Sequence, residues 1–120
     1  MLRSSYYMLA VLLMVLALVS CSMNDSTPTS TSPNTVIIMD NSFSPQTLAV
    51  VVGRLVVWKN EGNNSHTVTS GTPTSNPGSI FDSGILAPGG GFTFAFSQAG
   101  QYSYFCKIHG ASMSGIIIVQ

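Results

Sequence analysis

Charged residues are scarce in this chain, and their scarcity narrows the classes of partner. Only 7% of the 120 residues are charged, and four basic and four acidic side chains leave a formal net charge of zero. The chain has no basic stripe for nucleic acid and no acidic block for a cationic partner. We therefore expect no nucleic-acid partner.

The length of the chain allows one domain and not two.

Long hydrophobic runs are also scarce, because the sequence has one such run, at residues 8–19. It follows Arg3 and spans about a dozen residues, too few for a bilayer span of roughly 20. It ends in Leu18-Val19-Ser20-Cys21, which resembles a bacterial lipobox. We expect residues 1–20 to be a lipoprotein signal peptide and Cys21 to carry lipid. An ordinary signal peptide cleaved near Ser20 and an uncleaved anchor are the alternatives.

The segment after Cys21 lacks a hydrophobic period and is rich in Ser, Thr, Pro and Asn. This composition predicts that residues 21–34 are the acylated cysteine and a disordered tether. The folded domain is then expected at residues 35–120. The chain would be exported and held by its N-terminal lipid at the outer face of a cell membrane or in the periplasm.

Cysteine is limited to Cys21 and Cys106. If Cys21 carries lipid, Cys106 has no disulfide partner. An unpaired thiol in an oxidising compartment is a liability unless something binds it. A metal ion is the obvious candidate.

The expected domain consists of short β-branched and aromatic runs separated by turn residues, with no sustained helical period. Phe92, Phe94 and Phe96 alternate with small or polar residues, as in a half-buried strand. Residues 71–79 are rich in Gly, Pro, Asn and Ser and predict a long loop. This pattern favours an all-β sandwich or barrel. The expected strands are 36–39, 48–52, 55–58, 66–70, 92–96, 100–106 and 116–119.

Four side chains in this domain suggest a metal site. Cys106, His109 and Met113 lie in one short segment between the last two expected strands, and His66 follows an earlier polar loop. Loops at one end of a sandwich are neighbours, so His66 can meet the other three. Two imidazoles and a thiolate in a plane, with a weak axial thioether, are the ligands of blue-copper electron-transfer sites.

Each of these residues also has an ordinary structural explanation. Cys106 could be a buried structural thiol, and Met113 could fill the core. His66 could be a solvated loop histidine. A zinc site would also use a cysteine and two histidines, although a thioether is a poor zinc ligand. The expectation for Lys107 is that it is solvated.

From residue 36 to its end, the chain resembles the cupredoxins. The resemblance implies a Greek-key β-sandwich that holds one type 1 copper, cycling between Cu(I) and Cu(II), for electron transfer. By position, His66, Cys106 and His109 would be the equatorial ligands and Met113 the axial ligand. The matching features are Phe43-Ser44-Pro45, Gly53, Val57-Trp58-Lys59-Asn60, His66-Thr67-Val68, Phe81-Asp82-Ser83-Gly84, Phe96, the segment 100–106, His109, Met113 and Gly115.

The chain departs from the family pattern near the ligands. Three residues separate His109 from Met113, and Gly110 stands where many relatives have proline. Thr67 follows the first histidine, where other members have an asparagine that pins the ligand loop. We expect the Thr67 hydroxyl to serve this role around the metal.

The function expected from the resemblance is that of a monomeric one-electron carrier between redox proteins. A copper chaperone or buffering protein with the same ligands is the alternative, although the chain has no methionine-rich or histidine-rich tract. An enzyme with a small-molecule substrate is not expected. Copper oxidases and nitrite reductases of related fold need further histidine-coordinated copper, and this chain has two histidines in all.

Overall fold

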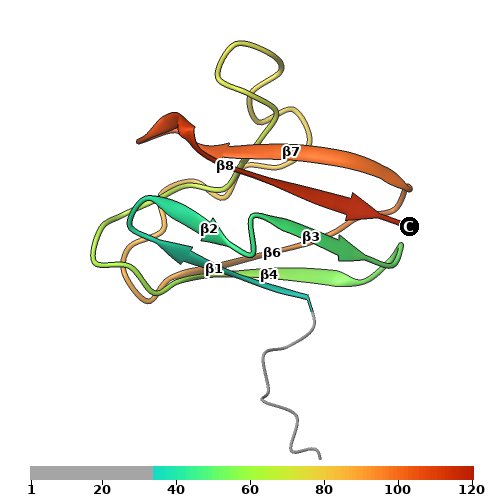
Figure 1. Ribbon diagram of the computed structural model, residues 1–120, viewed down its shortest axis with the longest axis horizontal. Coiled ribbons are helices and arrows are strands. Elements are labelled where there is room, and N and C mark those ends of the chain that lie inside the picture. The colour runs from blue at the N-terminus through green and yellow to red at the C-terminus, as the bar shows by residue number, and fades with distance from the viewer. Residues whose placement is uncertain (1–33) are drawn as a thin grey trace, which may run out of the picture.

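The computed structural model describes residues 34–120, which form two stacked β-sheets and, within that range, no helix (Figure 1). One sheet has the strand order β2-β1-β4-β6 and the other β3-β8-β7-β5. The predicted all-β Greek-key sandwich is confirmed. The strands are β1 (Thr35–Met39), β2 (Ser42–Ser44), β3 (Thr47–Val50), β4 (Leu55–Asn60), β5 (Thr69–Ser70), β6 (Gly91–Ala95), β7 (Gly100–Cys106) and β8 (Gly110–Val119).

The core between the sheets follows from the two-residue period of the strands. In β4, Val56, Trp58 and Asn60 are buried, whereas Lys59 between them is exposed. The aromatic ring of Phe81 packs against Trp58 from the loop before β6, with ring centroids 5.8 Å apart. Apolar side chains from both sheets complete this core, among them Val36, Ile38, Phe43, Phe96, Tyr104, Ile117 and Val119.

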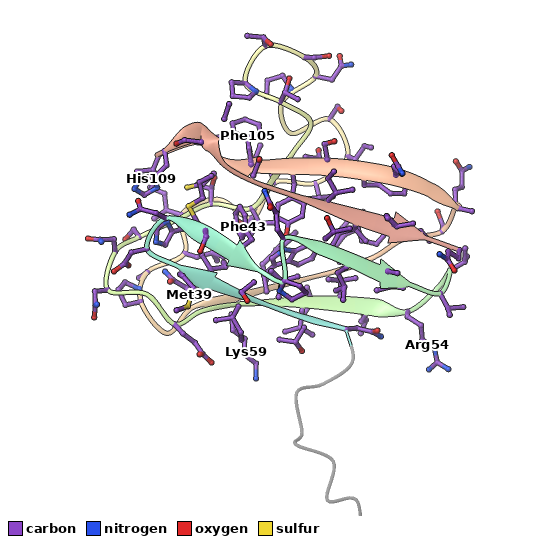
Figure 2. All side chains as sticks on the ribbon, viewed as in Figure 1. Met39, Phe43, Arg54, Lys59, Phe105 and His109 are labelled. Atoms are coloured by element: carbon purple, nitrogen blue, oxygen red, sulfur yellow. The ribbon has the colours of Figure 1, made fainter. Side chains whose placement is uncertain are left out.

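The strand connections bring segments that are distant in the sequence to one end of the sandwich. β1 pairs with β4 in parallel, and β3 pairs with β8 in parallel, so the chain crosses between sheets. β7 and β8 form an antiparallel hairpin. Figure 2 shows His109 at the hairpin end of the molecule and Arg54 at the opposite end. The turn after β1, the loop after β4 and the β7–β8 turn meet at the His109 end.

Three expectations about strands need correction. β2 was not expected, because Ser42-Phe43-Ser44 is too short to show a period. The strand expected at 66–70 is reduced to Thr69–Ser70, and His66 instead makes an isolated bridge with Leu86. The last strand begins at Gly110, six residues before the expected Ile116, because small and polar residues at its start hide its pairing with β7.

The expected signal peptide at 1–20, the lipid site Cys21 and all but the last residue of the tether at 21–34 lie outside the described residues. Within the described part, no helix has the length and apolar character needed to cross a membrane.

Candidate metal centre

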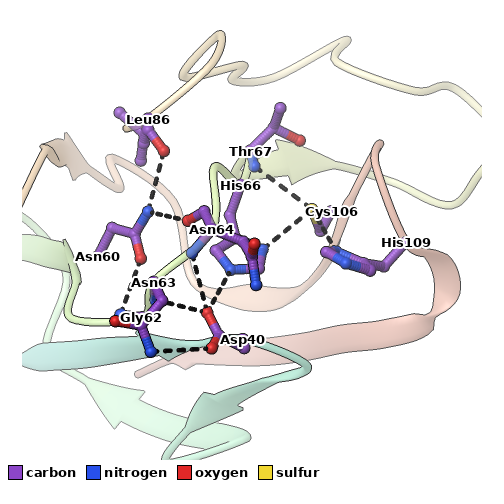
Figure 3. Close-up of polar contacts among 10 residues, drawn as sticks. All are labelled: Asp40, Asn60, Gly62, Asn63, Asn64, His66, Thr67, Leu86, Cys106 and His109. Carbon is purple, nitrogen blue, oxygen red and sulfur yellow. Dashed lines mark hydrogen bonds and ion pairs between the residues drawn. The ribbon is translucent and has the colours of Figure 1, made fainter. Parts of the chain in front are cut away.

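Three side chains with metal-binding atoms meet at the His109 end of the sandwich. The ligand atoms of His66, Cys106 and His109 all lie within 4.8 Å of one another. Cys106 Sγ is 3.8 Å from His66 Nδ1 and 3.6 Å from His109 Nδ1. Both imidazoles therefore present the same nitrogen to the thiol (Figure 3). Cys106 and His66 are fully buried, while His109 is partly exposed.

The local backbone explains how each residue reaches this position. Cys106 is the last residue of β7, and His109 is the last residue of the short turn before β8. His66 exchanges two backbone hydrogen bonds with Leu86: His66 donates at 3.0 Å and accepts at 2.8 Å. Each ligand candidate is thus attached to paired backbone on at least one side.

Met113 lies near the other three residues, but on β8 and not in a loop. The β7–β8 register shifts between Phe105, which pairs with Ser114, and Cys106, which pairs with Gly110. The extra residues on β8 form a bulge, a feature that re-aims side chains. Met113 is 1% exposed and belongs to the same buried cluster as Cys106. Met113 is therefore a buried side chain on β8 that lies near the other three residues.

Gly115 makes room beside this bulge. A Cβ atom at position 115 would overlap the ring and hydroxyl of Tyr104, which lies in the core one strand away. Tyr104 is 1% exposed, and burial raises its pKa to about 12 despite an opposing interaction with Trp58. Its phenol therefore stays protonated and behaves as a packing group beneath the site.

A closed set of polar contacts holds the backbone next to Cys106. The Thr67 backbone N–H points to Cys106 Sγ at 3.4 Å, and the Thr67 hydroxyl accepts a 2.8 Å hydrogen bond from the Lys107 backbone N–H. The same hydroxyl is 3.0 Å from that of Thr69, which donates to Asp82 at 3.3 Å. Asp82 in turn pairs with the Lys107 ammonium group. Lys107 was expected to be solvated, and it is exposed. Its ammonium group also completes this ring by pairing with Asp82.

Asn60 ties together the two segments that flank His66. Its side-chain amide donates hydrogen bonds of 2.9 Å to the carbonyls of Asn64 and Leu86, and its oxygen accepts one of 3.1 Å from Gly62. Asn60 is 1% exposed. Sequence reasoning gave it no role. The one sequence feature that could have indicated its burial is its place two residues after Trp58, on the same inward face of β4.

Asp40 was also missed. Its carboxylate accepts backbone hydrogen bonds from Asn63 at 2.6 Å and Asn64 at 3.0 Å. The hydrogen bond from Asn64, and next those from Asn63, hold the pKa of Asp40 below its ordinary value against partial desolvation. The nearer oxygen lies 3.7 Å from His66 Nε2.

The buried setting also controls the charge of His66. Burial lowers the pKa of His66, the nearby His109 lowers it further, and Asp40 opposes both. A lowered pKa favours the neutral imidazole at pH 7, which is the form that binds a metal.

These donors fit one type 1 copper. A buried thiol, two imidazoles that turn the same nitrogen toward it, and a buried thioether match the soft and intermediate donors of blue-copper sites. Zinc does not explain why a buried methionine lies near these residues. The fold and the site together define the class as a copper-binding β-sandwich.

Comparison with known proteins places the chain in a family. Residues 9–119 match the family model of the cupredoxin-like domain, and the chain belongs to the cupredoxin family. It is 36% identical over 84 residues to the chloroplast plastocyanin of Tetradesmus obliquus, a match that covers 65% of this chain and 58% of that protein. The chain thus spans less than two thirds of this relative.

Two solved structures show the same sandwich. A purple cupredoxin from Nitrosopumilus maritimus aligns with a TM-score of 0.65 and 26% identity, over 72% of this chain and 98% of that one. A copper-containing nitrite reductase from Thermus scotoductus aligns with a TM-score of 0.60 and 31% identity, over 73% of this chain but 22% of the reductase.

Proposed function

We propose that this protein is a blue-copper electron carrier that exchanges single electrons with redox proteins. The observation that carries the proposal is the convergence of Cys106 Sγ, His66 Nδ1 and His109 Nδ1 at one end of the sandwich, with Met113 buried beside them. Copper bound there would supply a one-electron Cu(I)/Cu(II) couple. His66, Cys106, His109 and Met113 would be the residues that hold it.

The protein's own part in this function is to keep the ligands still. The Thr67 hydroxyl fixes the backbone after Cys106. The Asn60 amide fixes both the loop before His66, at Asn64, and the Leu86 backbone that pairs with His66. A geometry that suits both oxidation states needs little rearrangement when an electron arrives or leaves. Thr67 thereby acts on the metal through the ligand loop and not as a ligand.

Burial favours electron transfer over copper delivery. Cys106 and His66 are fully buried, so a metal held by them is not open to transfer to another protein's ligands. His109 is the partly exposed ligand candidate, with Ile108 51% exposed beside it. This edge places an exposed apolar side chain beside the histidine for brief contact with a redox partner.

The proposed role is that of a carrier and not an enzyme. The similar nitrite reductase shares only 22% of its length with the match. Both histidines of this chain lie in the one site, and no histidine is left to bind a second, catalytic copper.

We also propose that the domain is exported as a monomer and anchored by lipid at Cys21. The support is the apolar run that ends in Leu18-Val19-Ser20-Cys21. Two or three acyl chains give stable anchoring where one is marginal. Fatty-acid labelling of cells should mark the wild type and not Cys21→Ser. An unlabelled wild type would contradict the anchor and leave the copper proposal intact.

Voltammetry of the copper-loaded full-length protein tests the carrier function. A reversible one-electron wave is expected, because the ligands are fixed on paired backbone. An irreversible wave, or loss of copper on reduction, would indicate copper release and not electron transfer.

A further inference from the structure

His66 has one nitrogen that the metal site does not use. Its Nδ1 faces Cys106 Sγ, so its Nε2 points away from the site. The side chain is fully buried, and Nε2 makes no hydrogen bond with any group in the described part of the chain. A buried imidazole nitrogen without a partner is costly. Whatever faces Nε2 therefore affects which nitrogen carries the proton and how strongly Nδ1 donates.

The group that faces Nε2 is the carboxylate of Asp40. Asp40 Oδ1 lies 3.7 Å from His66 Nε2, which is longer than a hydrogen bond and makes the pair an electrostatic contact. Figure 3 shows the carboxylate and Cys106 on opposite sides of the His66 ring. A negative charge on this side favours a proton on Nε2 and leaves the Nδ1 lone pair free.

Asp40 is held in this position by other parts of the chain. The backbone N–H groups of Asn63 and Asn64, in the loop that leads to His66, both donate to Oδ1. Gly62 in the same loop leaves the necessary space, because a Cβ atom there would overlap Oδ1. The loop therefore both receives the carboxylate and aims it at His66.

We propose that Asp40 is a positioning residue for the metal centre: its carboxylate selects the His66 form protonated on Nε2, so that Nδ1 faces the metal, and its charge biases the centre toward Cu(II). The first part depends on the protein alone. The second part rests on the proposed copper function. Partners of this kind behind a ligating histidine orient the ring and raise its basicity.

Three variants separate the charge of Asp40 from its shape. Asp40→Asn keeps an oxygen that accepts from Asn63 and Asn64 but removes the charge. Asp40→Ala removes both. Gly62→Ala keeps the charge but displaces the carboxylate. The matched control is Glu61→Gln, which removes an exposed negative charge from the same loop at a residue with no side-chain hydrogen bond in the described structure.

The reduction potential of the copper-loaded full-length protein tests the charge. Both Asp40 variants should raise it, since loss of a nearby negative charge destabilises Cu(II). We expect the Cu(II)-to-Cu(I) affinity ratio to fall roughly fivefold, or ~40 mV at 59 mV per tenfold change. Gly62→Ala should shift the potential in the same direction by less, and Glu61→Gln least of all. An Asp40→Asn shift no larger than that of Glu61→Gln would overturn the bias toward Cu(II).

Nitrogen NMR of the metal-free full-length protein at pH 7.5 tests the tautomer independently of copper. The wild type should hold His66 protonated on Nε2, because the Asp40 charge faces that nitrogen. Asp40→Asn should do so less completely, because its amide oxygen carries only a partial negative charge. Asp40→Ala should populate the Nδ1-protonated form. Equal tautomer populations in wild type and Asp40→Ala would overturn the positioning role. If the wild type bound no copper, the proposed function would fail, but this measurement would still decide the role of Asp40.

Discussion

The two segments that carry the histidines of the site are built differently. The segment before β5 holds His66 fully buried, and the His66 backbone pairs with that of Leu86. The side-chain amide of Asn60 donates to the carbonyls of Asn64 and Leu86. The β7–β8 turn holds His109 partly exposed, supported by a 2.8 Å hydrogen bond from the Ser112 hydroxyl to its carbonyl. His66 is thus held in a fixed geometry, whereas His109 is accessible to a partner protein. Cys106 Sγ lies close to both imidazoles.

The largest expected effect comes from removing the residue that joins the two segments. Cys106→Ser should abolish the intense visible band of the copper-loaded protein, because that band requires a thiolate bound to Cu(II). The fold should persist, because serine is smaller than cysteine and the surrounding sheets are otherwise unchanged. Absorption spectra with circular dichroism as the folding check decide this. If the copper-loaded Cys106→Ser protein were still blue, Cys106 would not be a copper ligand.

The His66 segment should be the more sensitive to loss of a single polar group. Asn60→Ala leaves the Asn64 carbonyl without its side-chain donor and removes one of the two hydrogen bonds that the Leu86 carbonyl accepts, so it should lower the free energy of unfolding by about 2–3 kcal/mol. Urea denaturation of the metal-free protein measures this. Asn41→Ala is the control, since Asn41 is exposed and its side chain makes no hydrogen bond within residues 34–120. Equal losses in the two variants would show that Asn60 is not a clamp.

A smaller effect is expected at the Thr67 ring, which supports Cys106 from the His66 side. Thr67→Val removes the acceptor for the Lys107 backbone N–H and should cost about 1–2 kcal/mol, whereas Thr67→Ser retains the hydroxyl and should cost less. The same denaturation experiment checks it. If Thr67→Ser is as damaging as Thr67→Val, the methyl group and not the hydroxyl matters.

Met113 should affect the potential more than the stability. Met113→Leu should raise the reduction potential, and Met113→Gln should lower it, because an axial oxygen stabilises Cu(II). Volume-conserving exchange with leucine in the core costs less than about 1.5 kcal/mol. Voltammetry decides the matter. An unchanged potential in both variants would place the axial ligand elsewhere.

The smallest expected effect is on the His109 side, and it concerns only the rate of electron transfer. Ala111 is exposed on β8 next to this turn. Ala111→Asp should slow electron self-exchange between oxidised and reduced copies several-fold at low salt, because like charges then meet at the contact. Ala99→Asp, in the turn before β7 at the far end of that strand, is the matched control. Equal self-exchange rates for the two variants would indicate that electrons do not leave the protein near His109.

The parts of the site that could be predicted are those fixed by local sequence. Cys106 and His109 are three residues apart across one turn, so their spacing already indicates a shared site. Asp40 and Asn60 could not be found in this way, because their contacts join the β1–β2 turn and the end of β4 to a loop whose path only the fold determines. Likewise, the placement of Met113 on a strand depends on a bulge, which leaves no periodic signal in Gly110-Ala111-Ser112.

The same distinction applies to the fold. The alternating runs of β4 and β6 were visible because each turns one face toward the core. β7 was visible by its aromatic residues, although both of its faces are buried from Tyr104 to Cys106. β2 and β5 have three and two residues, and such strands form only because neighbours are present to pair with them.

The absorption and EPR spectrum of the Cu(II)-loaded full-length protein tests the central claim most directly. A site with His66, Cys106, His109 and Met113 as ligands predicts an intense visible band from thiolate-to-copper charge transfer, with narrow copper hyperfine splitting. A weakly absorbing protein with the wide hyperfine splitting of ordinary nitrogen-and-oxygen copper sites would contradict it.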